Sequence, residues 1–294
     1  MTSNGHTADL RCALASAARA DGLVGTAPPA RTFMAVELPG PWGRNAIRES
    51  RASTSALVDL ARRVSGAGGR LVVLRRPGRR SVSHRRWFWA DCRPGHETLR
   101  TGVIADDDEL GALALDGTDG QREDEALWLC CTHGKHDRCC AEEGRVVFAD
   151  LEALTPGRVW ESSHLGGCRF AGNVVVLPHG LYYGRMSTAD VPALVAAHLR
   201  GEVLLEHLRG RSALPAPAQA AMQLVARQVA SRAIDAVEVG EPREADENVW
   251  TVPVSADGTT MSASVRRTGA GEPVRLTCTA VAPDRPPAWA LERP

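Results

Sequence analysis

The chain has 294 residues, of which 44% are hydrophobic and 24% charged, and its 35 basic residues balance its 35 acidic ones. This composition is typical of a soluble globular protein with one large or two ordinary domains, and it excludes a disordered chain. The zero net charge removes any whole-chain electrostatic case for binding nucleic acid or an anionic membrane, and no apolar run is long enough to span a bilayer.

The opening of the chain, residues 1–25, lacks the basic start and apolar core of a secretory signal. We therefore expect a cytoplasmic protein. In that reducing compartment, clustered cysteines are more often metal ligands or redox thiols than structural disulfides.

The first part of the chain alternates between strand-like and helix-like patterns. We expect strands at 31–38, 70–76 and 86–92, with a helix at 55–64 between the first two. Trp87 and Trp89 share one face of the third strand and should pack in a core. The arginine-rich stretch 69–86 is expected to form a solvated edge, or else to dock an acidic redox partner, rather than to bind nucleic acid. The acidic, turn-rich residues 104–125 predict an exposed connection between domains.

The same order of elements returns in the central part of the chain. The patterns predict a strand at 126–131, a helix at 141–154, strands at 158–163 and 173–178, and a helix at 189–201 with Asp190 as an early cap. Tyr182 and Tyr183 lie at a hairpin beside the strand at 173–178 and should pack in the core or at the edge of the sheet.

The remainder of the chain predicts a small α+β appendage. It consists of a helix at 221–237 and strands at 249–254, 260–267 and 274–281. We therefore expect three units: an N-terminal α/β domain at 1–120, a central domain at 121–212 and the appendage at 213–294.

Two segments of the central unit concentrate soft, basic side chains. Residues 130–140 read CCTHGKHDRCC, and residues 161–173 read ESSHLGGCRFAGN. Cys131 and Cys140 are separated by eight residues, and His164 and Cys168 by three. Thiolates and imidazoles that converge from loops at neighbouring strand ends are typical of a metal or iron–sulfur site. Glycines in these loops, Gly134, Gly166 and Gly167, would allow the backbone to turn tightly there.

The pairing of CTHGKHDRCC with SHLGGCRFAGNVVVLPHGLYYGRM resembles the sucrase/ferredoxin-like family over residues 126–186, and TAPPARTFMAVELPGPWG (26–43) is similar to the N-terminal signature of its bacterial members. The resemblance implies a thioredoxin-like [2Fe-2S] ferredoxin domain. Carried over position by position, it implies that the cluster ligands are Cys131, Cys140, His164 and Cys168. Well-understood members have a histidine where this chain has Cys168. An additional anionic ligand should lower the reduction potential.

Several assignments stay open at this level. Cys139 could replace Cys140 as a ligand if the loop register differs. Three cysteines and a histidine are also a common zinc set, although the interval between Cys131 and Cys140 is longer than in most zinc knuckles. His133 and His136 are expected to donate hydrogen bonds around the site or to face solvent, and Asp137 to orient a neighbouring group.

The other cysteines are interpreted as structural. Cys130 alternates with Cys131 along a strand and should face the opposite core. Cys12, Cys92 and Cys278 lie in separate segments with no partner spacing.

We expect an electron carrier with one [2Fe-2S] cluster that exchanges electrons with redox partner proteins. The alternatives are a zinc-stabilised interaction module and a thioredoxin-like thiol oxidoreductase, for which the usual C-x-x-C pair is missing. The family name also implies sucrose cleavage, but no pair of carboxylates here supports glycoside hydrolysis. The oligomeric state is not predicted.

Overall fold

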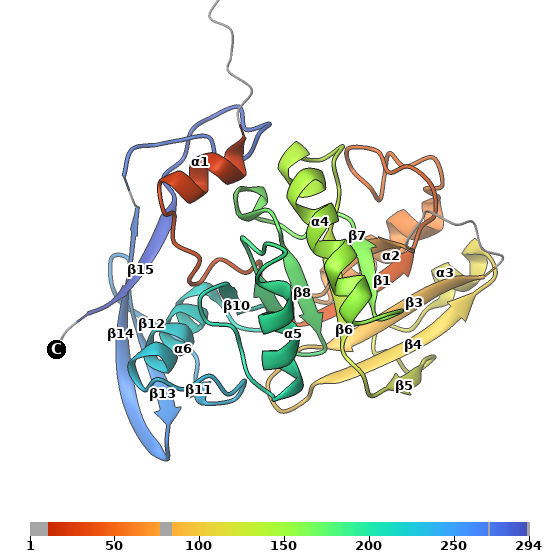
Figure 1. Ribbon diagram of the computed structural model, residues 1–294. Helices are drawn as coiled ribbons and strands as arrows, with labels where there is room; N and C mark the ends of the chain where they lie inside the picture. Colours follow the sequence, from red (N-terminus) through yellow and green to blue (C-terminus); the bar gives the residue numbers. More distant parts are fainter. Residues whose placement is uncertain (1–10, 77–83, 270, 293–294) are drawn as a thin grey trace, which may run out of the picture.

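The computed structural model describes residues 11–76, 84–269 and 271–292. Figure 1 shows one long sheet with helices packed against it and a smaller curved sheet near the C-terminus. This architecture confirms the expected α/β class and the small C-terminal α+β unit. Within the described ranges, no helix is long and apolar enough to cross a membrane. Part of the arginine-rich stretch, residues 77–83, lies outside the described residues.

The N-terminal unit has the expected order of strand, helix, strand, strand. Its elements are α1 (Cys12–Ala18), β1 (Thr32–Glu37), α2 (Ser55–Gly66), β2 (Arg70–Arg75), β3 (Arg85–Asp91) and β4 (Thr98–Ile104). Helix α2 begins after Thr54, whose hydroxyl accepts the Leu57 amide hydrogen, and its apolar face is buried. Trp87 and Trp89 are buried in the same core cluster, as predicted. The acidic connection contains α3 (Asp107–Ala112) and β5 (Gln121–Glu123).

The central unit contains the elements that position the site. They are β6 (Leu127–Cys131), α4 (Arg138–Leu154), β7 (Val159–Ser162), the short 3-10 helix η2 (Cys168–Phe170), β8 (Val174–Leu177), β9 (Leu181–Tyr183), α5 (Val191–Leu199) and β10 (Leu208–Arg211). Tyr182 and Tyr183 are fully buried, as expected. Asp190 precedes α5, but its carboxylate accepts from the amide and hydroxyl of Ser187 instead of from the helix.

One sheet of ten strands runs through both units, in the order β10-β9-β8-β6-β7-β2-β1-β3-β4-β5. Strands β1 and β2 are parallel, as are β6 and β7, and the two pairs meet through the antiparallel β2–β7 contact. Elements on the two sides of residue 120 hydrogen-bond within the same sheet. The domain boundary expected at residue 120 remains a prediction.

The C-terminal unit consists of α6 (Ala216–Gln228) and a second sheet. The strands of this sheet are β11 (Val237–Val239), β12 (Arg243–Asp246), β13 (Val249–Ala256), β14 (Thr259–Gly269) and β15 (Pro287–Leu291). The predicted helix at 221–237 is misplaced. It starts earlier, after Pro215, and ends before Ala230, whose positive φ of 53° does not continue a helix.

The strand predicted at 274–281 is wrong. This segment forms a loop, with one isolated bridge between Val274 and Asp284. Instead of joining the C-terminal sheet, it crosses to α1 and the start of α4, where the backbone amide of Cys278 donates to Asp137. A tertiary contact therefore overrides the alternating apolar pattern of the segment.

Candidate metal centre

Strand β6 brings Cys131 to the site. Its backbone amide donates to Asn173 O at 3.0 Å, and its side chain lies at the end of the strand beside the parallel β7. Because side chains alternate along a strand, Cys130 faces the other way. Cys130 packs in a different core cluster, and its thiol donates to Gly144 O at 3.2 Å. The prediction that Cys130 belongs to the core is confirmed.

The first turn of α4 carries both Cys139 and Cys140. Asp137 caps this helix by accepting the Cys139 amide hydrogen at 3.0 Å. Successive residues on an α-helix point about 100° apart, so the two thiols face different neighbours. Cys140 lies with Cys131 and His164, whereas Cys139 lies with Cys12 and Cys278. The sequence left open whether Cys139 or Cys140 lies beside Cys131, and in the structure it is Cys140.

The loop after β7 supplies His164 and Cys168. Cys168 Sγ lies 3.5 Å from His164 Nδ1, and the His164 carbonyl accepts from Arg70 at 2.8 Å. Gly167 precedes η2 with a φ of 73°, and a Cβ at this position would collide with the guanidinium of Arg209. The tight turn predicted from the glycines is therefore required both by the backbone and by the close approach of a buried arginine.

The four predicted ligand residues meet in three overlapping groups, one of which joins Cys140 and Cys168 to Asp137. The ligand atoms of Cys131, Cys140 and His164 lie within 4.8 Å of one another, and the same holds for His136, His164 and Cys168. They converge because β6 and β7 are parallel, so the segments after both strands leave the sheet at the same edge. Their role as ligands remains a prediction.

His136 comes closer to this centre than the sequence indicated. Its ring stacks on that of His164, with 3.7 Å between the centroids and 23° between the planes. His133, by contrast, uses its Nε2 atom to bond Gly43 O at 2.8 Å. The only sequence signal for His136 was its place inside the cysteine-rich segment.

Hydrogen bonds link Cys131, Cys140, Cys168 and His164 and shift their pKa values. A hydrogen bond from Cys140 lowers the pKa of Cys131 well below its usual value, and a hydrogen bond from the same thiol lowers the pKa of Cys168 to about 5 despite burial. The same bonds raise the pKa of Cys140. Burial opposes protonation of His164, but bonds to Cys131 and Cys168 raise its pKa to about 9. Two thiolates are thus stabilised, and thiolates are the form that binds soft metals.

The imidazole side of the centre faces the surface. A pocket of about 460 Å³ is lined in part by Arg44, Glu49, Arg70, His133, His136 and His164. The thiols of Cys131, Cys140 and Cys168 are buried, with exposures of 1%, 1% and 0%. Solvent therefore reaches this centre through its histidines.

The donor chemistry fits an iron–sulfur cluster. Three thiols and an imidazole are soft donors, and the overlapping groups that they form with His136 and Asp137 offer positions for more than one metal atom. The compactness of the group formed by Cys131, Cys140 and His164 also suits a single zinc ion.

Residues 23–210 match the model of the sucrase/ferredoxin-like family. A structure of a thioredoxin-like [2Fe-2S] ferredoxin from Aquifex aeolicus is similar over 32% of this chain and 97% of its own, with 21% identity and a TM-score of 0.27. A cysteine-to-serine variant of the Aquifex aeolicus ferredoxin covers 29% of this chain and 97% of its own, with 20% identity and a TM-score of 0.26. No curated protein matches this chain.

Proposed function

Because this chain belongs to the sucrase/ferredoxin-like family, we propose that it is an electron-transfer protein carrying one [2Fe-2S] cluster with mixed cysteine and histidine ligands. The observation that carries the proposal is the convergence of Cys131, Cys140, His164 and Cys168 from three chain segments at one edge of the sheet.

The proposed ligands are linked to one another by hydrogen bonds. Cys140 is hydrogen-bonded to both Cys131 and Cys168, and His164 Nδ1 lies 3.5 Å from Cys168 Sγ, so two of the four ligands would bind each iron. When bound, such a cluster accepts and releases one electron. The protein would hold the thiolates in place, exclude water from them and set the potential through charge and hydrogen bonds.

Electron exchange would take place on the histidine side. His164 and His136 stack at the pocket that opens to the surface, whereas the thiols are covered. We propose that a redox partner protein docks over this pocket, in the cytoplasm, where the cysteines remain reduced. Arg44 and Arg70 at the pocket would favour a partner with acidic groups.

The second candidate is a zinc-stabilised interaction module that uses the same residues. It is supported by the compact group of Cys131, Cys140 and His164. Cofactor content separates the two functions, because zinc is colourless and does not change oxidation state.

The test is a visible absorption spectrum of anaerobically purified protein, with iron, sulfide and zinc measured on the same sample. We expect broad visible bands with about two irons and two sulfides per chain. The Cys168→Ser variant should lose most of the iron, whereas Cys130→Ser, a neighbouring cysteine on the opposite face, should keep it. A colourless wild-type protein whose zinc is lost on Cys168→Ser would establish the zinc module instead.

The family difference at Cys168 provides a second test. Cys168→His should retain the cluster and raise its reduction potential, because a neutral ligand replaces an anionic one. A redox titration of the two proteins at the same pH measures the difference. An equal or lower potential in the variant would mean that Cys168 is not a ligand.

A further inference from the structure

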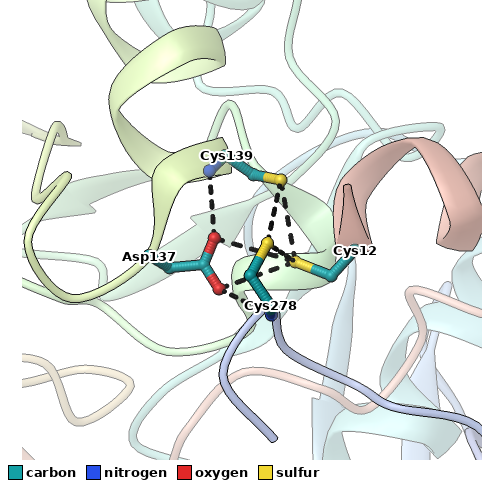
Figure 2. A group of neighbouring side chains, drawn as sticks. All are labelled: Cys12, Asp137, Cys139 and Cys278. Atoms are coloured by element: carbon teal, nitrogen blue, oxygen red, sulfur yellow. Dashed lines mark hydrogen bonds between the residues drawn. The ribbon is translucent and has the colours of Figure 1, made fainter. Parts of the chain in front are cut away.

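Three cysteines and one aspartate form a second cluster that adjoins the proposed iron–sulfur site, since a carboxylate oxygen of Asp137 also lies within 4.8 Å of the sulfurs of Cys140 and Cys168. Figure 2 shows Cys12, Cys139 and Cys278 with their sulfurs facing one another, and Asp137 with its carboxylate turned toward them. The Sγ atoms are 3.8 Å apart for Cys12 and Cys139, and 3.4 Å apart for both Cys139–Cys278 and Cys278–Cys12. The nearer carboxylate oxygen lies 3.6 Å from Cys12 Sγ.

We propose that Cys12, Cys139, Cys278 and Asp137 bind one zinc ion as a second, structural metal site. In a tetrahedral site with Zn–S bonds of about 2.3 Å and Zn–O bonds of about 2.1 Å, two sulfurs lie about 3.8 Å apart and a sulfur and an oxygen about 3.6 Å apart. The S–S distances here, 3.4 to 3.8 Å, and the S–O distance of 3.6 Å are close to these values, so a single ion fits with small outward shifts of the thiols.

The carboxylate is oriented for this role. Asp137 Oδ1 accepts from the backbone amide of Cys139 and Oδ2 from that of Cys278, each at 3.0 Å. Each oxygen retains a second lone pair for a metal. Capping of α4 explains the first bond, but it does not explain why a loop from the far end of the chain brings a thiol and an amide to the same carboxylate.

The cluster does not resemble ordinary core packing. Cys12 and Cys139 are 1% and 2% exposed, and Asp137 is 2% exposed. A carboxylate among buried thiols is costly unless a cation or hydrogen bonds compensate it. A disulfide would join only two of the three sulfurs and leave the third beside the carboxylate. One zinc ion would use all four donors, and the three thiols would release their protons to solvent as it binds.

A metal here would tie distant parts of the chain together. Cys12 opens α1, Cys139 lies in the first turn of α4, and Cys278 lies in the C-terminal loop, 266 residues from Cys12. In Figure 1, α1 and the blue C-terminal loop lie side by side at the upper left of the molecule. Four protein donors leave no open position for substrate, which is the arrangement of a structural zinc site.

The experiment is metal analysis of the full-length protein with single substitutions away from the proposed iron ligands. Wild type should contain about one zinc per chain that is lost in Cys12→Ser and in Cys278→Ser. Iron content and the visible spectrum should remain unchanged in both. Cys92→Ser, a buried cysteine outside both clusters, should retain zinc and iron.

The reciprocal variant separates this proposal from the proposed function. Cys168→Ser should remove iron and leave the zinc of the second site in place. A wild-type protein without iron, whose zinc still depends on Cys278, would overturn only the electron-transfer function. Zinc retained in both Cys12→Ser and Cys278→Ser would overturn the second site.

X-ray absorption at the zinc edge of the wild-type protein gives a test that does not depend on folding of the variants. It should report about three sulfur neighbours at about 2.3 Å and a lighter atom at about 2.0–2.2 Å. A protein without zinc, or peptide mapping that finds a disulfide among Cys12, Cys139 and Cys278, would also overturn the proposal.

Discussion

Arg209 is a fully buried cation next to the proposed cluster. Its guanidinium donates to Thr26 O at 2.7 Å, to Gly166 O at 2.9 Å and to Asn173 Oδ1 at 2.7 Å. It also lies over the ring of Phe170, at 5.1 Å from the centroid. Burial lowers the pKa of Arg209 to about 10, so it remains charged at neutral pH. A fixed positive charge beside Cys168 favours the reduced, more negative state of a cluster.

We therefore expect Arg209→Gln to lower the reduction potential by tens of millivolts, on the order of one screened charge interaction. Arg209→Lys retains the charge and should change the potential much less. Both variants leave buried carbonyls unpaired and should lose about 1–3 kcal/mol of unfolding free energy. Redox titration and denaturant unfolding measure the two effects. Equal potentials for all three proteins would contradict the electrostatic role.

At the level of elements, the close approach of α4 to β6 determines where the thiols sit. Gly144 lies in α4 against the end of β6, and a Cβ there would overlap the carbonyl oxygen of Cys131. The helix can pack at this distance only because residue 144 has no side chain. The same contact places Cys140 in the first turn beside Cys131.

Gly144→Ala should therefore destabilise the protein by about 1–3 kcal/mol, because the helix must move away from the strand. It should also reduce iron content, since Cys140 moves with α4. Gly111→Ala is the matched control: it lies in α3, where the nearest atom to an added Cβ is 3.9 Å away. That change should stabilise by up to about 1 kcal/mol through helix propensity. Thermal unfolding and iron assays of both variants test the contrast, and similar behaviour would contradict it.

At the scale of the whole molecule, the two halves of the long sheet share one hydrophobic core cluster and are joined within the sheet by strands β2 and β7. Strands β2 and β7 pair only at Leu74–Ser162 and Arg75–Glu161. Arg75 forms an ion pair with Glu161, with Nε 2.9 Å from Oε2, and stacks over Trp42 at 4.2 Å. The Thr132 hydroxyl donates to the same carboxylate at 3.0 Å. The side chains of the pair are only 6% and 14% exposed.

Breaking this pair should weaken the whole fold. Glu161→Gln leaves a buried cation without its partner and should cost on the order of 3 kcal/mol of unfolding free energy. Adding Arg75→Met should restore part of the loss, because the two effects are coupled. The exposed pair of Arg62 and Asp59, at 75% and 57%, is the control. Asp59→Asn should change stability by less than about 1 kcal/mol.

Denaturant unfolding followed by both tryptophan fluorescence and visible absorbance measures these differences. The two signals should change together, because both halves share one sheet and unfold cooperatively. Separate transitions in the wild-type protein would show instead that the units at 1–120 and 121–212 are independent domains.

The sequence by itself determined the α/β class, most strands of the long sheet and the grouping of Cys131, His164 and Cys168 with either Cys139 or Cys140. It could do so because strand alternation, helix periodicity and the meeting of parallel strand ends act over short stretches of chain. The opposite faces of Cys130 and Cys131 follow from the same alternation.

Only the tertiary structure decided which of Cys139 and Cys140 faces the proposed cluster, and only it brought Cys12 and Cys278 to Cys139. Residues 274–281 carry a strand-like pattern, yet they form a loop whose backbone is held by Asp137. No local spacing encodes a contact across 266 residues. Such a contact depends on how all the intervening elements pack, and for that reason it appears only when the whole chain is folded.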